Sequence, residues 1–198
     1  MRFNLRWKNL VAFALVFCMI FMSISASADT YINDVSSPVG YENNPEWAGD
    51  RMFDWLNKGM ISGYDTSSFR ADDAITKAEF IAIVNMVFGY HDTEFKTFDD
   101  VSESDWFYYD VAKAVRAGYV NPNESSFKPE SKISREEVTV MLAKVLRIDA
   151  KSYSSAARKF KDYSKIASEN RQFINAMVEM GYIGGYSDHT FRPKDPIT

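Results

Sequence analysis

The chain contains almost no cysteine and no excess of positive charge. Its 198 residues include one cysteine, Cys18, and carry 23 Lys and Arg against 27 Asp and Glu, for a formal net charge of −4. A single cysteine cannot form an intrachain disulfide, so the folded state must be stabilised by a packed core or by partners. The negative balance argues against nucleic acid as a partner, because that binding needs a general excess of positive charge. It leaves room for a local cationic site.

The N-terminus carries an apolar run of 13 residues, over 10–22. Basic residues precede the run and Ala26-Ser27-Ala28 follows it, which is the order of a secretory signal peptide. We therefore expect a signal peptide over 1–28 and an exported mature chain without Cys18 and without a stable membrane span. The alternative is an uncleaved membrane anchor, but the run is shorter than the ~20 residues that a helix needs to cross a bilayer.

One sequence pattern occurs three times in the rest of the chain. Each copy begins at a glycine, passes through a loop to Phe-Arg or Phe-Lys, and reaches Ile-Thr or Ile-Ser. The copies cover 59–79, 118–137 and 181–198, and their shared anchors are Phe69, Phe127, Phe191, Ile75, Ile133 and Ile197. A repeat of this kind fixes the structural unit. We divide the chain into a lead-in segment over 29–46 and units over 47–95, 96–150 and 151–198, the third truncated before its second helix.

Each unit is predicted to contain amphipathic helices. Apolar residues recur at i, i+3 and i+4 in the first helix of each unit, over 47–58, 106–117 and 168–180. A glycine that can adopt the left-handed cap conformation follows each of these helices. In the third unit, the apolar face includes Phe173, Met177 and Met180. Little in the sequence calls for a β-sheet, so the predicted fold is mainly all-α, an assembly of helix–loop–helix units.

The second helix of a unit is predicted to begin with a capping box. The tetrapeptides at 76–79 and 134–137 read Thr-Lys-Ala-Glu and Ser-Arg-Glu-Glu. In a capping box, the hydroxyl accepts from the backbone N–H three residues on, and the glutamate returns a bond to the cap. This structural role accounts for four residues, Thr76, Glu79, Ser134 and Glu137.

Capping does not account for Lys77 and Arg135. A cation in the first turn opposes the helix dipole by about 0.3–1 kcal/mol, yet the chain places one there twice. One explanation is an anion site, since free N–H groups at a helix N-terminus favour anions and a cation would add charge and reach. The other is a solvated cation that a nearby glutamate neutralises. Both alternatives remain open from the sequence.

The joint pattern closely resembles the S-layer homology repeat. That family is marked by a Gly-Tyr loop, an F-R-P-type turn and an I-T-R-A-E helix start, which correspond to Gly185-Tyr186, Phe191-Arg192-Pro193 and 75–79. The resemblance covers nearly all of the mature chain and implies a pseudo-threefold, mostly helical unit of three repeats. It also implies a non-catalytic module that binds secondary cell-wall polysaccharide, often carrying pyruvate ketals. Such a module holds exported proteins on the surface of a Gram-positive-type bacterium.

The resemblance implies binding residues as well. In the family, grooves between repeats use the cation of the helix start together with nearby Trp and Gly-loop residues. Carried over, this gives Lys77 and Arg135 for anion recognition, Trp47 and Trp106 for packing on sugars, and Gly63, Tyr64, Gly185 and Tyr186 in the loops. No cofactor and no metal is implied.

This chain departs from the family pattern in the second copy. Glu136 stands where the family has alanine, which adds a negative charge beside Arg135. The second loop reads Asn121-Pro122-Asn123 and lacks the Gly-Tyr turn. In the third copy, Glu169 aligns with the tryptophan of the other first helices. These differences predict that one or more of the grooves is degenerate.

The same residues are compatible with two other functions. The chain could be the N-terminal anchor of a secreted enzyme whose catalytic domain follows residue 198, or a self-assembling S-layer protein with other surface-layer subunits as partners. His91 and His189 lack metal-ligand spacing, and the Asp-rich loops do not match the EF-hand pattern. The sequence therefore predicts no catalytic or metal site within 1–198.

Overall fold

The structure is a computed structural model that describes residues 73–150 and 155–198. The predicted signal peptide over 1–28, the lead-in segment and the first helix of the first unit lie outside the described residues, as does Gly59. The described part holds the second helix of the first unit, both helices of the second unit and the first helix of the third unit.

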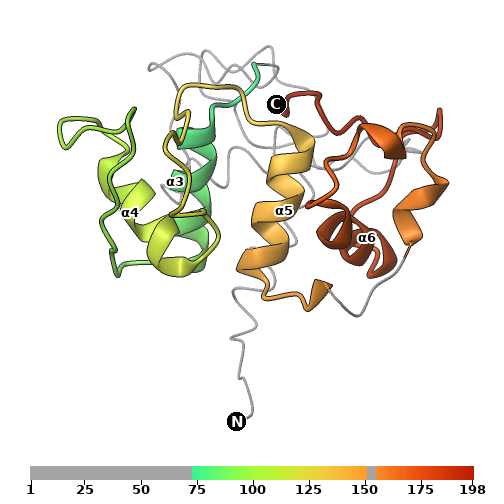
Figure 1. The fold of residues 1–198 in the computed structure, drawn as a ribbon, viewed down its shortest axis with the longest axis horizontal. Coiled ribbons are helices and arrows are strands. Elements are labelled where there is room, and N and C mark those ends of the chain that lie inside the picture. The colour runs from blue at the N-terminus through green and yellow to red at the C-terminus, as the bar shows by residue number, and fades with distance from the viewer. Residues whose placement is uncertain (1–72, 151–154) are drawn as a thin grey trace, which may run out of the picture.

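The described residues are mainly helical, as the sequence predicts (Figure 1). Strand pairing among them is limited to two isolated antiparallel bridges, Thr76 with Lys132 and Ser134 with Pro196. The elements in chain order are α3 (Lys77–Phe88), α4 (Tyr108–Ala117), α5 (Arg135–Val145), the 3₁₀ turns η2 (Ala156–Lys159) and η3 (Tyr163–Lys165), and α6 (Arg171–Glu179).

The glycines predicted to follow the first helices are placed correctly, whereas both predicted starts are too early and the predicted end of the third-unit helix is one residue too late. Gly118 and Gly181 follow α4 and α6 with φ of 83° and 73°, in the left-handed region that favours glycine. The starts predicted at residues 106 and 168 are wrong, because α4 begins at Tyr108 and α6 at Arg171. Neither helix has a side-chain cap that would extend it earlier.

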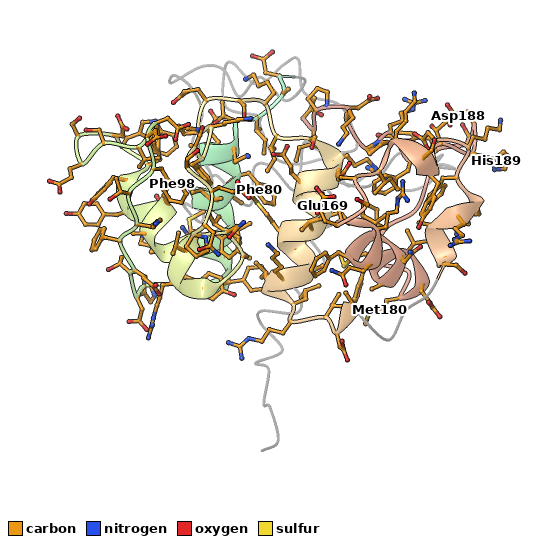
Figure 2. All side chains as sticks on the ribbon, viewed as in Figure 1. Phe80, Phe98, Glu169, Met180, Asp188 and His189 are labelled. Carbon is orange, nitrogen blue, oxygen red and sulfur yellow. The ribbon has the colours of Figure 1, made fainter. Side chains whose placement is uncertain are left out.

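The predicted apolar face of the third unit is right for Met177 and wrong for Met180. Met177 is fully buried and Phe173 packs against the core. Met180 is exposed and points away from α5 and α6 (Figure 2). The reason is that α6 ends at Glu179, so Met180 lies beyond the helix whose face the periodicity describes.

The helices pair across unit boundaries. The second helix of the first unit, α3, packs against α4 of the second unit, and α5 packs against α6 of the third (Figure 1). A polar link joins the first pair, since the hydroxyl of Tyr119 donates to Asn85 Oδ1 at 2.7 Å and Asn85 Nδ2 donates to the Asp110 backbone oxygen at 2.9 Å. The buried core is therefore built from neighbouring units together.

A closed ring of backbone hydrogen bonds joins the three copies of the repeat. Ile75 N–H donates to Ile197 O, Ile197 N–H to Ile133 O, and Ile133 N–H to Ile75 O, each at 3.1 Å. The three isoleucines are shared anchors of the repeat, and Ile75 and Ile133 directly precede the capping hydroxyls of α3 and α5. The ring places the starts of α3 and α5 beside the C-terminal segment of the third unit (Figure 1).

Two anchors of the repeat, Phe127 and Phe191, attach the loops of the second and third units to the core. Their rings lie 5.9 Å from Phe98 and 5.6 Å from Phe160, and all four are buried. A carboxylate fixes each loop. Those of Asp100 and Asp162 each accept two backbone N–H groups, from Phe127 and Lys128 and from Phe191 and Arg192.

Replacing Phe191 by alanine should lower the free energy of unfolding by about 3–5 kcal/mol, because it empties a fully buried aromatic site. Urea unfolding followed by circular dichroism measures the change. The matched control is Phe95→Ala at an exposed ring, expected to cost less than about 1 kcal/mol. Equal losses for the two variants would contradict the buried role of Phe191.

Candidate functional site

Both predicted capping boxes are present. Thr76 Oγ1 accepts from Glu79 N at 3.2 Å, and Glu79 Oε2 accepts from Thr76 N at 2.7 Å. At α5, Ser134 Oγ accepts from Glu137 N at 3.3 Å, and Glu137 Oε2 accepts from Ser134 N at 3.0 Å. The boxes fix the first turn of each helix and thereby the starting direction of the side chains at 77 and 135.

The other N–H groups of each first turn bond to the next unit. Those of Lys77 and Ala78 donate to Ser131 O at 2.9 Å and Pro129 O at 3.0 Å. Those of Arg135 and Glu136 donate to Asp195 O at 2.9 Å and Pro193 O at 3.0 Å. Inter-unit backbone bonds and the caps already use these N–H groups, so an anion at either helix start would have to be bound by side chains and not by free N–H groups.

These contacts define two junctions. The first junction is where the start of α3 meets residues 127–133 and the start of α5, and the second junction is where the start of α5 meets residues 184–197. Equivalent positions of the repeat occupy each junction. Their side chains differ, and the chemistry of the two junctions differs accordingly.

At the first junction, Lys77 is buried and paired within the protein. The residue is 8% exposed, and its Nζ lies 2.8 Å from Glu137 Oε1 and 5.6 Å from the centre of the Phe127 ring. Of the two alternatives left open by the sequence, neutralisation by a glutamate is the one found at Lys77. That glutamate belongs to the next unit, and the lysine is the more deeply buried partner of the pair. Desolvation raises the pKa of Glu137, but hydrogen bonds from Lys77 and Ser134 outweigh it and leave that pKa below its ordinary value.

At the second junction, Arg135 is buried against aromatic rings. The residue is 5% exposed, and its Nη2 donates to Gly184 O at 2.9 Å. Its Cζ lies 4.9 Å from the Tyr186 ring centre and 5.2 Å from that of Phe191, within cation–π range. Desolvation lowers the pKa of Arg135, and the neighbouring positive charge of Arg192 acts in the same direction.

A second arginine, which the sequence analysis did not assign, shares the Tyr186 ring. Arg192 Cζ lies 4.0 Å from the ring centre, and its guanidinium bonds to Asp188 Oδ2 at 3.0 Å and Thr190 Oγ1 at 3.2 Å. Hydrogen bonds from Thr190, together with one from Arg192, hold the pKa of Asp188 well below its usual range. The Phe-Arg pair of the repeat was the only sequence signal for this position.

Glu136 turns its charge toward the third unit. Its Oε1 accepts from Ala167 N at 3.0 Å and Asn170 Nδ2 at 2.7 Å, and its Oε2 lies 2.9 Å from Lys194 Nζ. The carboxylate is buried and all three partners belong to the third unit. The extra acid of the second copy therefore joins the second and third units at this junction.

The other predicted site residues are placed as follows. Trp106 is 61% exposed and contacts Phe107 of its own unit, at 5.4 Å between ring centres. No contact among the described residues brings Trp106 to Lys77 or Arg135. Gly185 lies beside Tyr186, and a Cβ there would collide with the Phe160 ring and with Thr190 O, so packing alone requires a glycine. Trp47, Gly63 and Tyr64 lie outside the described residues.

Within residues 73–150 and 155–198, no group of three or more His, Cys, Asp or Glu could hold a metal ion. In the same part of the chain, no helix has the length and apolar character needed to cross a membrane.

Comparison with known proteins decides the family. The sequence model of the S-layer homology domain matches residues 42–81, 97–139 and 159–198. The chain belongs to the S-layer homology family. This domain anchors surface proteins to the cell wall and is itself a non-catalytic module. Three tandem matches agree with the closed three-copy ring that the isoleucines form.

Relatives of this chain include structural proteins and enzymes. It is 25% identical over 153 residues to an S-layer protein of Bacillus thuringiensis subsp. finitimus, covering 77% of this chain and 19% of that protein. It is 24% identical over 155 residues to an amylopullulanase of Thermoanaerobacterium thermosulfurigenes, covering 77% of this chain and 8% of the enzyme. It is 27% identical over 147 residues to a cellulosome-anchoring protein of Acetivibrio thermocellus, covering 70% of this chain and 32% of that protein. The chain thus spans a minor part of each relative.

The Lys77–Glu137 pair should make stability depend on acid pH. Because the pKa of Glu137 is lowered by folding, its stabilising effect is present above the unfolded value near 4.5 and is lost as the pH falls below it. Glu137→Gln should cost about 1–3 kcal/mol at pH 7, and the difference from wild type should shrink between about pH 5 and pH 3. Denaturant titrations across this pH range measure the difference in unfolding free energy. Glu130→Gln at an exposed site is the control. A difference that stays constant with pH would refute the assignment.

The Glu136–Lys194 contact should behave as a coupled pair. Glu136→Ala should lower the free energy of unfolding by about 1–3 kcal/mol, because it leaves Ala167 N and Asn170 Nδ2 without their acceptor. Once Glu136 is gone, Lys194→Ala should add little, because the exposed lysine has lost its partner. A double-mutant cycle of unfolding free energies checks this coupling, and strict additivity would contradict it.

Proposed function

We propose that this chain is a non-catalytic module that holds an exported protein at the cell surface by binding an acidic secondary cell-wall polysaccharide. Membership of a family of wall-anchoring domains supports the anchoring role. The predicted signal peptide over 1–28 is the proposed export signal, and pyruvate ketals on the polysaccharide are the proposed acidic groups. The observation that carries the proposal is the arginine-rich second junction.

The two junctions differ in their capacity to bind an anion. At the first, Glu137 meets the charge of Lys77 at 2.8 Å. At the second, the guanidinium of Arg135 lies over Tyr186, next to Gly185, and donates to a backbone oxygen, whereas the second guanidinium, that of Arg192, is paired with Asp188 at 3.0 Å. Guanidinium groups match the planar geometry of a carboxylate better than ammonium groups do. The second junction is thus the better candidate site for the anionic sugar. The proposed role of Lys77 is to hold the first and second units together through Glu137.

The remaining residues of the site are proposed from the family resemblance. Trp106 presents an exposed ring at the start of α4 that can pack on a sugar face. Trp47, Gly63 and Tyr64 would contribute from the first unit. These residues would extend the contact with neutral parts of the polysaccharide, beyond the charged group held at the second junction.

What the module anchors is proposed from its relatives. An amylopullulanase and an S-layer protein contain a region similar to this chain. The region makes up 8% of the enzyme and 19% of the S-layer protein. Either an enzyme or a surface-layer subunit can therefore follow a module of this kind. The wall-binding role is the same in both cases.

Co-sedimentation with purified walls tests the function. The chain should bind walls of the producing bacterium and lose binding when hydrofluoric acid has removed the secondary polysaccharide. Free polysaccharide should compete, and binding should weaken as salt rises, because part of the affinity is charge attraction. Equal binding to intact and stripped walls would contradict the proposal, as would a failure to bind intact walls.

A further inference from the structure

An exposed cluster of three aromatic rings lies on the second unit, away from the second junction. Its members are Phe95, Tyr108 and Tyr109, whose ring centres lie 5.2 to 6.0 Å apart. Phe95 is 55% exposed and Tyr109 is 61% exposed. Helix α4, whose first residues carry both tyrosines, lies at the end of the molecule opposite α6 (Figure 1).

Neither the repeat nor the core requires these rings. Counted back from the glycine after the first helix, the positions of the two tyrosines hold Gly49-Asp50 in the first unit and Arg171-Gln172 in the third. The pair of tyrosines therefore belongs to the second copy alone. Burial does not account for Phe95 and Tyr109 either, since more than half of each side chain remains in contact with solvent. Their presence calls for another explanation.

The rings hold one another in place before any ligand arrives. The backbone N–H of Glu94 donates to Ala112 O at 3.0 Å, which fastens the loop before Phe95 to α4. The Phe95 ring then stacks on Tyr108 with an interplanar angle of 23°, and Tyr109 meets Phe95 edge-on at 79°. Side chains that are already ordered lose little conformational entropy when they bind a ligand.

The charged groups beside the rings pair with one another. Glu94 lies 3.8 Å from Arg116, and Asp110 lies 3.0 Å from Lys113. A charged ligand at this surface would have to compete with these pairs. The tyrosine hydroxyls can each donate and accept a hydrogen bond. The cluster therefore suits a ligand that is uncharged and carries hydroxyl groups.

The cluster is too small to hold a second copy of the chain. A fully buried aromatic side chain covers about 150–250 Å², and only part of each ring is exposed, so the three rings offer less than about 400 Å². A stable protein–protein contact needs about 800 Å² from each partner. The area fits a few sugar residues better than the surface of a protein.

We propose that Phe95, Tyr108 and Tyr109 form a further binding site, which takes an uncharged β-1,4-linked glucan chain. All ring substituents of β-glucose are equatorial, so both faces of the sugar present C–H groups that pack on aromatic rings. The sugar hydroxyls would bond to the hydroxyls of the two tyrosines. This site goes beyond the proposed function, because its ligand carries no acid and its residues belong to neither junction.

The test uses the full chain and cellopentaose, a soluble chain of five β-1,4-linked glucose residues. Isothermal titration calorimetry compares wild type with Phe95→Ala, Tyr109→Ala and Tyr109→Phe. The matched control is Met180→Ala, which removes an exposed apolar side chain from the third unit. Thermal melting verifies that each variant is folded, and sedimentation equilibrium records whether the chain self-associates.

Wild type should bind cellopentaose with an affinity that does not change with salt, because the ligand is uncharged. Phe95→Ala and Tyr109→Ala should each weaken binding about five- to tenfold, since each removes one stacking surface. Tyr109→Phe should keep most of the affinity because it keeps the ring. Met180→Ala should match wild type.

Three results would overturn the inference. The first is a wild-type chain that does not bind cellopentaose, and the second is a loss of affinity in Met180→Ala equal to that in Tyr109→Ala. The third is self-association that Tyr109→Ala abolishes, which would assign the cluster to a second copy. None of these results bears on the proposed function, which is tested by salt-sensitive sedimentation with walls.

Discussion

The arrangement of this protein depends on three backbone hydrogen bonds among Ile75, Ile133 and Ile197. Ile133 and Ile197 lie in the core and the partly buried Ile75 packs against it. A buried peptide group without a partner would cost about 1–3 kcal/mol, so these bonds favour one arrangement of the units. The ring brings the start of each second helix against the loop of the next unit. The capping boxes, the two cations and the Phe-anchored turns therefore meet at the junctions.

The cation of the repeated motif has different partners at the two junctions, because a few neighbouring side chains differ. Glu137 caps α5 and also pairs with Lys77, so one carboxylate serves its own helix and the preceding unit. Glu136, an acid where the family has alanine, finds three donors in the third unit. With that charge engaged elsewhere, the guanidinium of Arg135 remains over Tyr186.

Sequence reasoning succeeded where the cause is local. A hydroxyl and a glutamate three residues apart predict a capping box, and a glycine after an apolar stripe predicts a helix end. It failed where partners are distant in sequence. The sequence around Lys77 does not indicate that Glu137 is its partner. The carboxylate of Asp162 likewise accepts hydrogen bonds from residues 29 and 30 positions away. The error at Met180 has a related cause, since periodicity describes a helix face and not the residue where the helix stops.

The backbone ring also limits how many copies such a module can contain. Each isoleucine gives its N–H to one neighbour and its carbonyl to the other, all in the same direction around the centre. Three copies satisfy every group, and a fourth would have to open the ring to enter. Selection acting on this architecture would therefore favour gains and losses of complete triplets over those of single repeats.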